Sequence, residues 1–118
     1  MNKALGALAL LAGMLAGSAH AEGKKLSGEE IQALLAGNTV KASDYVEFYD
    51  ASGTLRGAEK DGKYDGSWRV DGDNVCIAVP AYKYNECLTI RKEGERYAFV
   101  GKKKTVKVEV TAGNSEDL

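Results

Sequence analysis

The stretch VCIAVPAYKYNECLTI, residues 75–90, holds both cysteines of this 118-residue chain and decides how its second half folds. Two short segments rich in β-branched residues, VCIAV and NECLTI, flank the turn-forming PAYK. If Ala81 and Tyr82 form the centre of the turn, Cys76 lies directly opposite Cys87 in an antiparallel hairpin. Directly opposed residues without mutual hydrogen bonds have Cα atoms about 4.5 Å apart, which a disulfide accepts. The spacing therefore predicts a Cys76–Cys87 disulfide.

The first 21 residues, MNKALGALALLAGMLAGSAHA, have the order of a secretory signal peptide. Lys3 precedes an apolar run of about 13 residues, and Ala19-His20-Ala21 is a small-x-small cleavage site. A transmembrane helix needs about 20 apolar residues, so this run is too short to be one. We expect export to the periplasm, cleavage after Ala21 and no membrane span in the mature chain.

Export favours a structural role for the cysteines, because an oxidising compartment normally bridges a lone pair. Two other roles fit less well. A metal site would consist of two thiolates without a histidine, since His20 leaves with the signal peptide. A redox pair has C-x-x-C spacing, which is absent here. Neither a metal nor a cofactor is expected.

After the signal peptide the sequence predicts one helix and then strands. In LSGEEIQALLAGN, residues 26–38, Ser27 and Glu30 have capping-box spacing, and Gly37-Asn38 ends the helix. From Asn38 onward apolar and polar residues alternate, and turn-forming DASG, DGK, DGDN and EG interrupt the alternation. We predict a mainly β (α+β) fold: one N-terminal helix followed by a six- to seven-stranded antiparallel meander, curled into a bent sheet or half-open barrel. The helix is expected to cover one open end or one face.

The alternation also assigns side chains to faces. In YVEFY, residues 45–49, Val46 and Phe48 share one face, and Tyr45, Glu47 and Tyr49 share the other, where we expect exposed aromatic side chains. The same interpretation places Leu55 opposite Phe48. In two later strands the residues expected to share a face are Tyr64, Gly66, Trp68 and Val70, and then Val106, Val108 and Val110.

The length of the mature chain fits a single small domain. We expect residues 22–111 to form that β-rich domain and residues 112–118 to form a polar tail.

Catalysis is not expected from this sequence. Nucleophilic catalysis needs a nucleophile beside a base, but no histidine follows residue 21 and the cysteines are expected to be bridged. The aspartates Asp61, Asp65, Asp71 and Asp73 adjoin turn glycines, where aspartate is common for backbone reasons. DGDN lacks the glycine and glutamate of an EF-hand calcium loop.

Two kinds of residue are candidates for binding. From Lys83 to Lys107 the chain has eight basic residues against three acidic ones. The favoured interpretation is that these lysines protect edge strands against pairing with other chains. The alternative is a basic face for an anionic envelope polymer. Exposed aromatic side chains are favoured binding anchors. The candidate binding residues are Tyr45, Tyr49, Tyr64, Trp68, Tyr82, Lys102, Lys103 and Lys104.

Several motifs together resemble a family of small exported proteobacterial proteins of unknown function. They are LSGEEIQALLAGNTV, DASGTLRG, GSWRVDGDNVC, the second cysteine Cys87 and a closing apolar strand followed by GN. The resemblance covers nearly the whole mature chain. It implies export, the cysteine pair and a β-rich domain, and it implies no activity.

The sequence favours a non-enzymatic, exported binding or interaction module of the cell envelope. Its partner is unknown, with an envelope protein or an anionic envelope polymer as candidates, and nucleic acid is not expected. Two alternatives stay open. The expected architecture is similar to that of periplasmic lysozyme inhibitors, which suggests an inhibitor of a wall-degrading hydrolase. The second alternative is a carrier that holds a small apolar ligand inside the barrel.

Overall fold

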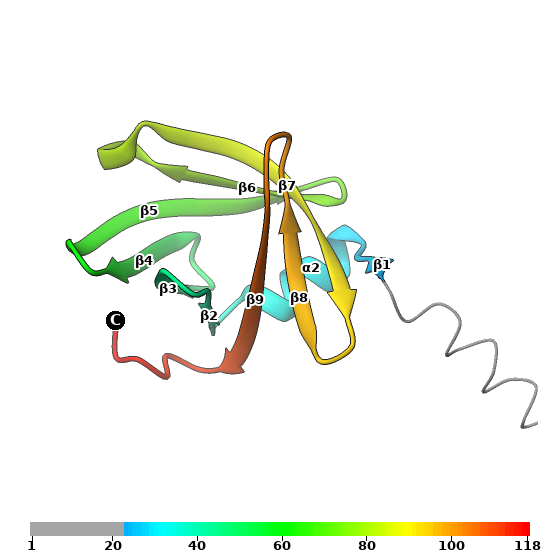
Figure 1. Cartoon of the computed structure of the whole chain (residues 1–118), viewed down its shortest axis with the longest axis horizontal. Coiled ribbons are helices and arrows are strands. Elements are labelled where there is room, and N and C mark those ends of the chain that lie inside the picture. Colours follow the sequence, from blue (N-terminus) through cyan, green and yellow to red (C-terminus); the bar gives the residue numbers. More distant parts are fainter. Residues whose placement is uncertain (1–22) are drawn as a thin grey trace, which may run out of the picture.

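The structure, a computed structural model, describes residues 23–118 (Figure 1). These residues form one helix, α2 (Gly28–Leu35), a short 3-10 helix, η1 (Pro80–Tyr82), and nine strands. In chain order the strands are β1 (Lys24–Lys25), β2 (Asn38–Lys41), β3 (Tyr45–Tyr49), β4 (Thr54–Glu59), β5 (Gly62–Asp71), β6 (Asn74–Val79), β7 (Tyr84–Glu93), β8 (Arg96–Val100) and β9 (Thr105–Ala112). The predicted signal peptide, residues 1–21, lies outside the described residues.

Strands β2 to β9 form a closed antiparallel barrel. Each strand pairs with its neighbour in the chain, and β9 pairs with β2, so that Val110 lies opposite Val40. The two-residue strand β1 pairs with the end of β7. The mainly β meander with one helix is confirmed for residues 23–118. The expected strand count was too low, because neither β1 nor the segment NTVK of β2 was predicted as a strand.

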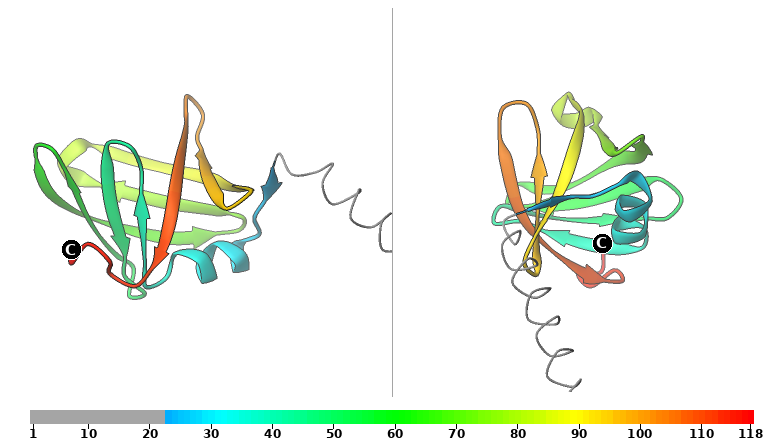
Figure 2. Two further views of the ribbon diagram at one scale, coloured as in Figure 1. Left: turned by 60° about the horizontal axis from the view of Figure 1, so that its bottom comes forward. Right: turned by 90° about the vertical axis from the view of Figure 1, so that its right-hand side faces the viewer.

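Helix α2 covers one end of the barrel. Ser27 Oγ accepts a hydrogen bond from the Glu30 backbone N–H, and the Glu30 carboxylate accepts one from the Ser27 N–H, so the predicted capping box is confirmed. Ile31 and Leu35 are fully buried. The Gly28 N–H donates to Asp73 Oδ1 at 2.8 Å, which ties the helix start to the β5–β6 turn. Figure 2 shows α2 and β1 near each other, on the same side as the start of the described chain.

The β6–β7 hairpin has the register predicted from the cysteines. Cys76 lies opposite Cys87, and their Sγ atoms are 2.00 Å apart, which is a disulfide. On the other face of the hairpin Val75, Ile77 and Val79 are buried. Lys83, which has a positive φ of 54°, completes the turn after η1.

The β3–β4 hairpin differs from the prediction by one residue. Leu55 lies opposite Tyr49, and Phe48 lies opposite Arg56. The loop has three residues, Ala51 to Gly53, and its last residue has a φ of 101°, which favours glycine. A one-residue shift turns every side chain to the other face of a strand. The expected facing of β3 was therefore wrong: Tyr49 is fully buried, and the Tyr45–Glu47–Tyr49 row faces the barrel interior.

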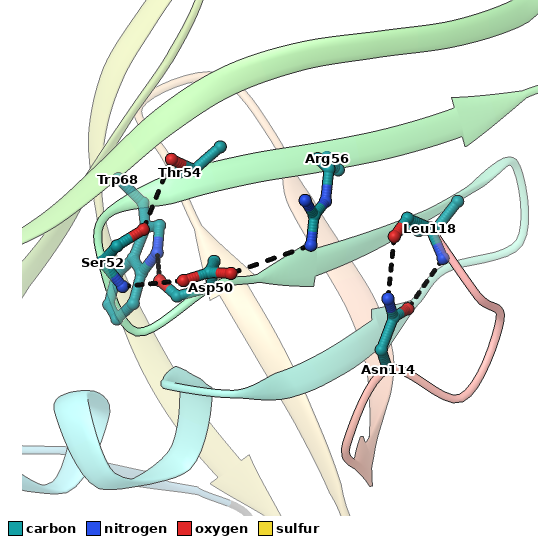
Figure 3. A network of polar contacts seen from close by, with 7 residues as sticks. All are labelled: Asp50, Ser52, Thr54, Arg56, Trp68, Asn114 and Leu118. Carbon is teal, nitrogen blue, oxygen red and sulfur yellow. Dashed lines mark hydrogen bonds and ion pairs between the residues drawn. The ribbon is translucent and has the colours of Figure 1, made fainter.

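Trp68 holds this hairpin loop against the core. Its Nε1–H donates to the Asp50 carbonyl at 2.8 Å (Figure 3). Its backbone N–H donates to the Gly53 carbonyl at 2.9 Å. The Trp68 ring packs edge-on against Tyr49, with ring centroids 5.5 Å apart. Together with Leu55 and the apolar residues of α2, these side chains fill the half of the barrel nearest the helix.

The segment after β9 folds back along β2. Thr39 Oγ1, which is buried, donates to the Gly113 carbonyl at 2.6 Å and accepts from the Ser115 N–H at 3.1 Å. The Asn114 side chain hydrogen-bonds both the N–H and the carbonyl of Leu118 (Figure 3). These contacts place the last residues against the outside of the barrel.

Strands β7 and β9 change partners along their length. The first half of β7 pairs with β6, whereas its second half, from Thr89, pairs with β8. Likewise β9 pairs first with β8 and then, from Glu109, with β2. The tip of the β8–β9 hairpin, residues 101–104, therefore lies beyond the strand pairings and projects from the sheet in Figure 2.

Candidate ligand-binding cavity

A cavity of about 630 Å³ lies inside the barrel, away from the helix-covered end. Its interior is lined mainly by aromatic and aliphatic side chains, and its rim carries the acidic Glu59 and Glu86 and three lysines. The lining residues are Tyr45, Glu47, Tyr49, Glu59, Tyr64, Ile77, Val79, Tyr82, Tyr84, Glu86, Leu88, Phe99, Lys102, Lys103, Lys104 and Val106. This size and composition are those of a site for one small molecule.

A buried glutamate is the main polar group in the cavity. Glu47 is 8% exposed, and its two carboxylate oxygens each accept one hydrogen bond. Tyr49 Oη donates to Oε1 at 3.0 Å, and Tyr64 Oη donates to Oε2 at 2.6 Å. Among residues 23–118, the six ion pairs of the structure do not include Glu47. Its partners are therefore neutral hydroxyl groups.

A glycine makes room for this network. Gly57 on β4 lies between Glu47 on β3 and Tyr64 on β5 in one cross-strand row. A Cβ atom at Gly57 would overlap the Tyr64 ring. Because the glycine has no side chain, the Tyr64 ring lies over it and its hydroxyl reaches the Glu47 carboxylate.

Burial changes the acidity of these groups. It raises the pKa of Glu47 above the ordinary value of 4.5, and the hydrogen bonds from Tyr64 and Tyr49 oppose that rise. Burial and the nearby Glu47 carboxyl also raise the pKa of Tyr45, Tyr49 and Tyr64. The three tyrosines therefore stay protonated at neutral pH and remain hydrogen-bond donors.

The rim of the cavity is polar. Tyr82, which is 52% exposed, donates a hydrogen bond from Oη to Glu59 Oε2, and its ring packs edge-on against Tyr64 at 5.2 Å. Tyr84 Oη donates to Glu86 Oε1 at 3.0 Å. Across the opening, the exposed Lys102–Lys104 segment forms the β8–β9 hairpin tip, and its first backbone N–H donates to Glu86 Oε2 at 3.4 Å.

The structure brings most of the predicted binding residues to this one cavity. Seven of them line it: Tyr45, Tyr49, Tyr64, Tyr82, Lys102, Lys103 and Lys104. Trp68 does not line it and belongs to the core. Tyr45 and Tyr49 were selected as exposed aromatics, yet they belong to the site because they face inward.

Sequence reasoning missed the central residue, Glu47, and also Tyr84 and Phe99. The signal for Glu47 was present in the sequence, because it alternates with Tyr45 and Tyr49. Once those tyrosines are placed inside the barrel, the same alternation places a carboxylate there.

Residues 23–118 contain neither a group of metal-ligating side chains nor a membrane-spanning helix. No group of three or more histidine, cysteine, aspartate or glutamate side chains is placed to hold a metal ion in that part of the chain. Within the same residues, no helix has the length and apolar character needed to cross a membrane.

Comparison of the chain with protein-family models, with curated proteins and with solved structures returned no match. The resemblance to a family of small exported proteins therefore stays a prediction.

Proposed function

We propose that this protein is a non-enzymatic, exported module of the cell envelope that holds one small, largely apolar molecule inside its barrel. The observation that carries this proposal is the cavity of about 630 Å³, open beside the β8–β9 hairpin and closed toward the helix. An eight-stranded barrel has an interior wide enough for one small ligand when side chains do not fill it.

The chemistry of the lining supports binding over catalysis. The only histidine, His20, lies in the predicted signal peptide, and both cysteines form a disulfide. The polar groups inside, Glu47 with Tyr49 and Tyr64, are already paired with one another. Such an arrangement suits orientation of a ligand by a few fixed polar contacts.

Filling the cavity tests this function. Val106 lines the cavity, and its neighbour Lys107 points outward from the same strand. We expect Val106→Trp to lose most binding of an apolar fluorescent probe such as N-phenyl-1-naphthylamine, while Lys107→Trp binds as the unchanged protein does. Fluorescence titration measures this. Equal binding by both variants would place the probe elsewhere and contradict the proposal.

Export is tested separately by intact mass. Protein recovered from the periplasm is expected to begin at Glu22 and to carry no lipid, because the small-x-small site precedes Glu22 and no cysteine follows it directly. Retention of residues 1–21 would show that the segment is not a cleaved signal peptide.

A further inference from the structure

The unusual feature of the cavity is that its buried carboxylate has no cationic partner among residues 23–118. A buried charge is normally paired with an opposite charge, because desolvation of an isolated ion is costly. Glu47 instead accepts hydrogen bonds from Tyr49 and Tyr64 alone. Burial disfavours the charged form of Glu47 and therefore raises the pKa of this carboxyl group. A positively charged ligand group beside Glu47 would compensate the negative charge of the carboxylate.

The surroundings of Glu47 suit a cation in a second way. Six aromatic side chains line the same cavity: Tyr45, Tyr49, Tyr64, Tyr82, Tyr84 and Phe99. The rings of Tyr49 and Phe99 have centroids 6.5 Å apart, and those of Tyr64 and Tyr82 are 5.2 Å apart. The faces of aromatic rings attract cations, and clusters of aromatic rings are a known means of holding quaternary ammonium groups.

An anionic ligand is the main competitor, because Lys102–Lys104 stands at the opening. These three lysines are exposed at a hairpin tip, whereas Glu47 is buried inside. A molecule whose anionic end met the lysines would place its apolar end against the Glu47 carboxylate. That arrangement leaves the buried charge uncompensated, so the geometry favours a cation.

We propose, building on the proposed function, that the cavity recognises an organic cation: an ammonium group on an apolar body, with the ammonium beside Glu47 and the body against the aromatic lining. Primary and quaternary ammonium groups share this chemistry. A primary ammonium also donates hydrogen bonds to the carboxylate, and a quaternary one interacts through charge and ring faces alone.

Four probes with one apolar body and different heads test the inference. They are hexylammonium, hexyltrimethylammonium, the neutral hexanol and the anionic hexanoate, each titrated into the exported protein by calorimetry at neutral pH. We expect at least one cation to bind about tenfold more tightly than hexanol, in line with the strength of desolvated cation–π contacts. The stronger of the two cations identifies the type of ammonium group.

Glu47→Gln is the decisive variant, because an amide keeps an acceptor for the tyrosines but removes the charge. The cation preference over hexanol is expected to disappear in Glu47→Gln. Glu95→Gln is the matched control, at an exposed position in the turn between β7 and β8. It should keep the preference for the cation over hexanol. Thermal melts by circular dichroism establish that both variants are folded.

Each other outcome has a defined meaning. Hexanoate as the tightest ligand would overturn the inference and assign recognition to the lysines. A cation preference that survives in Glu47→Gln would also overturn it. Hexanol binding without any cation preference would leave the cavity function standing and reject the cation. Binding of none of the probes would reject the proposed function and this inference together.

Discussion

Glu47 shows how one buried side chain links stability to pH. Because its pKa is raised on folding, the folded protein holds this proton more tightly than the unfolded chain does. The resulting stabilisation is complete below the unfolded pKa of about 4.5 and is lost as the pH rises toward the folded value. The nearby Tyr45, Tyr49 and Tyr64 stay neutral throughout, since their pKa values are raised as well.

We therefore expect the free energy of unfolding of the free protein to fall as the pH rises above 4.5, and to fall less in Glu47→Gln. At neutral pH the Gln variant should be the more stable of the two. Urea unfolding from pH 4.5 to pH 8 measures both effects, with Glu95→Gln as the control. Parallel profiles for the unchanged protein and Glu47→Gln would show that Glu47 titrates alike in the folded and unfolded states.

Gly57 gives a second prediction at the scale of one residue. A methyl group at this position would overlap the Tyr64 ring, so Gly57→Ala should destabilise the protein by about 1–3 kcal/mol, as overpacked sites do. Removing the ring should remove the clash. In a Tyr64→Ala background the same substitution is then expected to cost much less. Denaturant melts of the four proteins measure this, and additive costs would mean that the ring does not occupy this space.

The facing of β3 shows why residue-level prediction failed. The sequence DASG allows a hairpin loop of two or three residues, and the two choices differ by one position in register. Asp50 accepts a side-chain hydrogen bond from the Ser52 N–H, and Gly53 adopts a positive φ, so the longer loop forms. Those local contacts decide whether Glu47 faces solvent or the cavity, and the alternation alone does not contain them.

At the scale of elements, the β6–β7 hairpin could be predicted well because a covalent bond fixes its register. In the neighbouring β5–β6 pair Trp68 lies opposite Ile77, and Trp68 is buried on the face that the alternation assigned to it. Strand β2 was missed because its four residues follow directly on the helix and show little alternation. The predicted meander, a bent sheet or half-open barrel, is compatible with the structure, in which the β2–β9 pairing closes the barrel.

The disulfide gives a prediction for this hairpin. Reduction, or the double substitution Cys76→Ser with Cys87→Ser, should lower the free energy of unfolding by about 2–3 kcal/mol, because the unfolded chain regains the entropy of a short loop. Denaturant melts with and without reductant measure this loss. Ligand binding in the folded state should be unaffected, since neither cysteine lines the cavity. A reduced form as stable as the oxidised one would contradict the structural role.

At the scale of the whole molecule, the cavity itself could not be predicted. Candidate residues from β3, β5, η1 and the β8–β9 hairpin were selected separately, as aromatics or as a basic stretch. They meet because the barrel closes and because β7 and β9 change partners. Closure is a property of the complete strand order, which includes β2, a strand that was not predicted.

The lysine side chains at the opening of the cavity are expected to be dispensable for folding. The Lys102–Lys104 side chains are exposed, and the hydrogen bond of this segment to Glu86 uses a backbone N–H. Replacing all three lysines by glutamine should change the free energy of unfolding by no more than about 0.5 kcal/mol. Denaturant melts test this. A markedly earlier transition would mean that these side chains make contacts needed by the fold.

Closure of the barrel by β2 and β9 has a consequence for the order of assembly. The hairpins between them join near neighbours in the chain, whereas the β2–β9 pairing joins the two ends of the domain and bears the largest loop-closure cost. During synthesis, which proceeds from the N-terminus, β2 must wait for the last strand to emerge before the ring can form. We expect pulsed hydrogen exchange during refolding to protect the β6–β7 amides first and residues 109–112 last. Simultaneous protection would indicate that the ring closes in a single step.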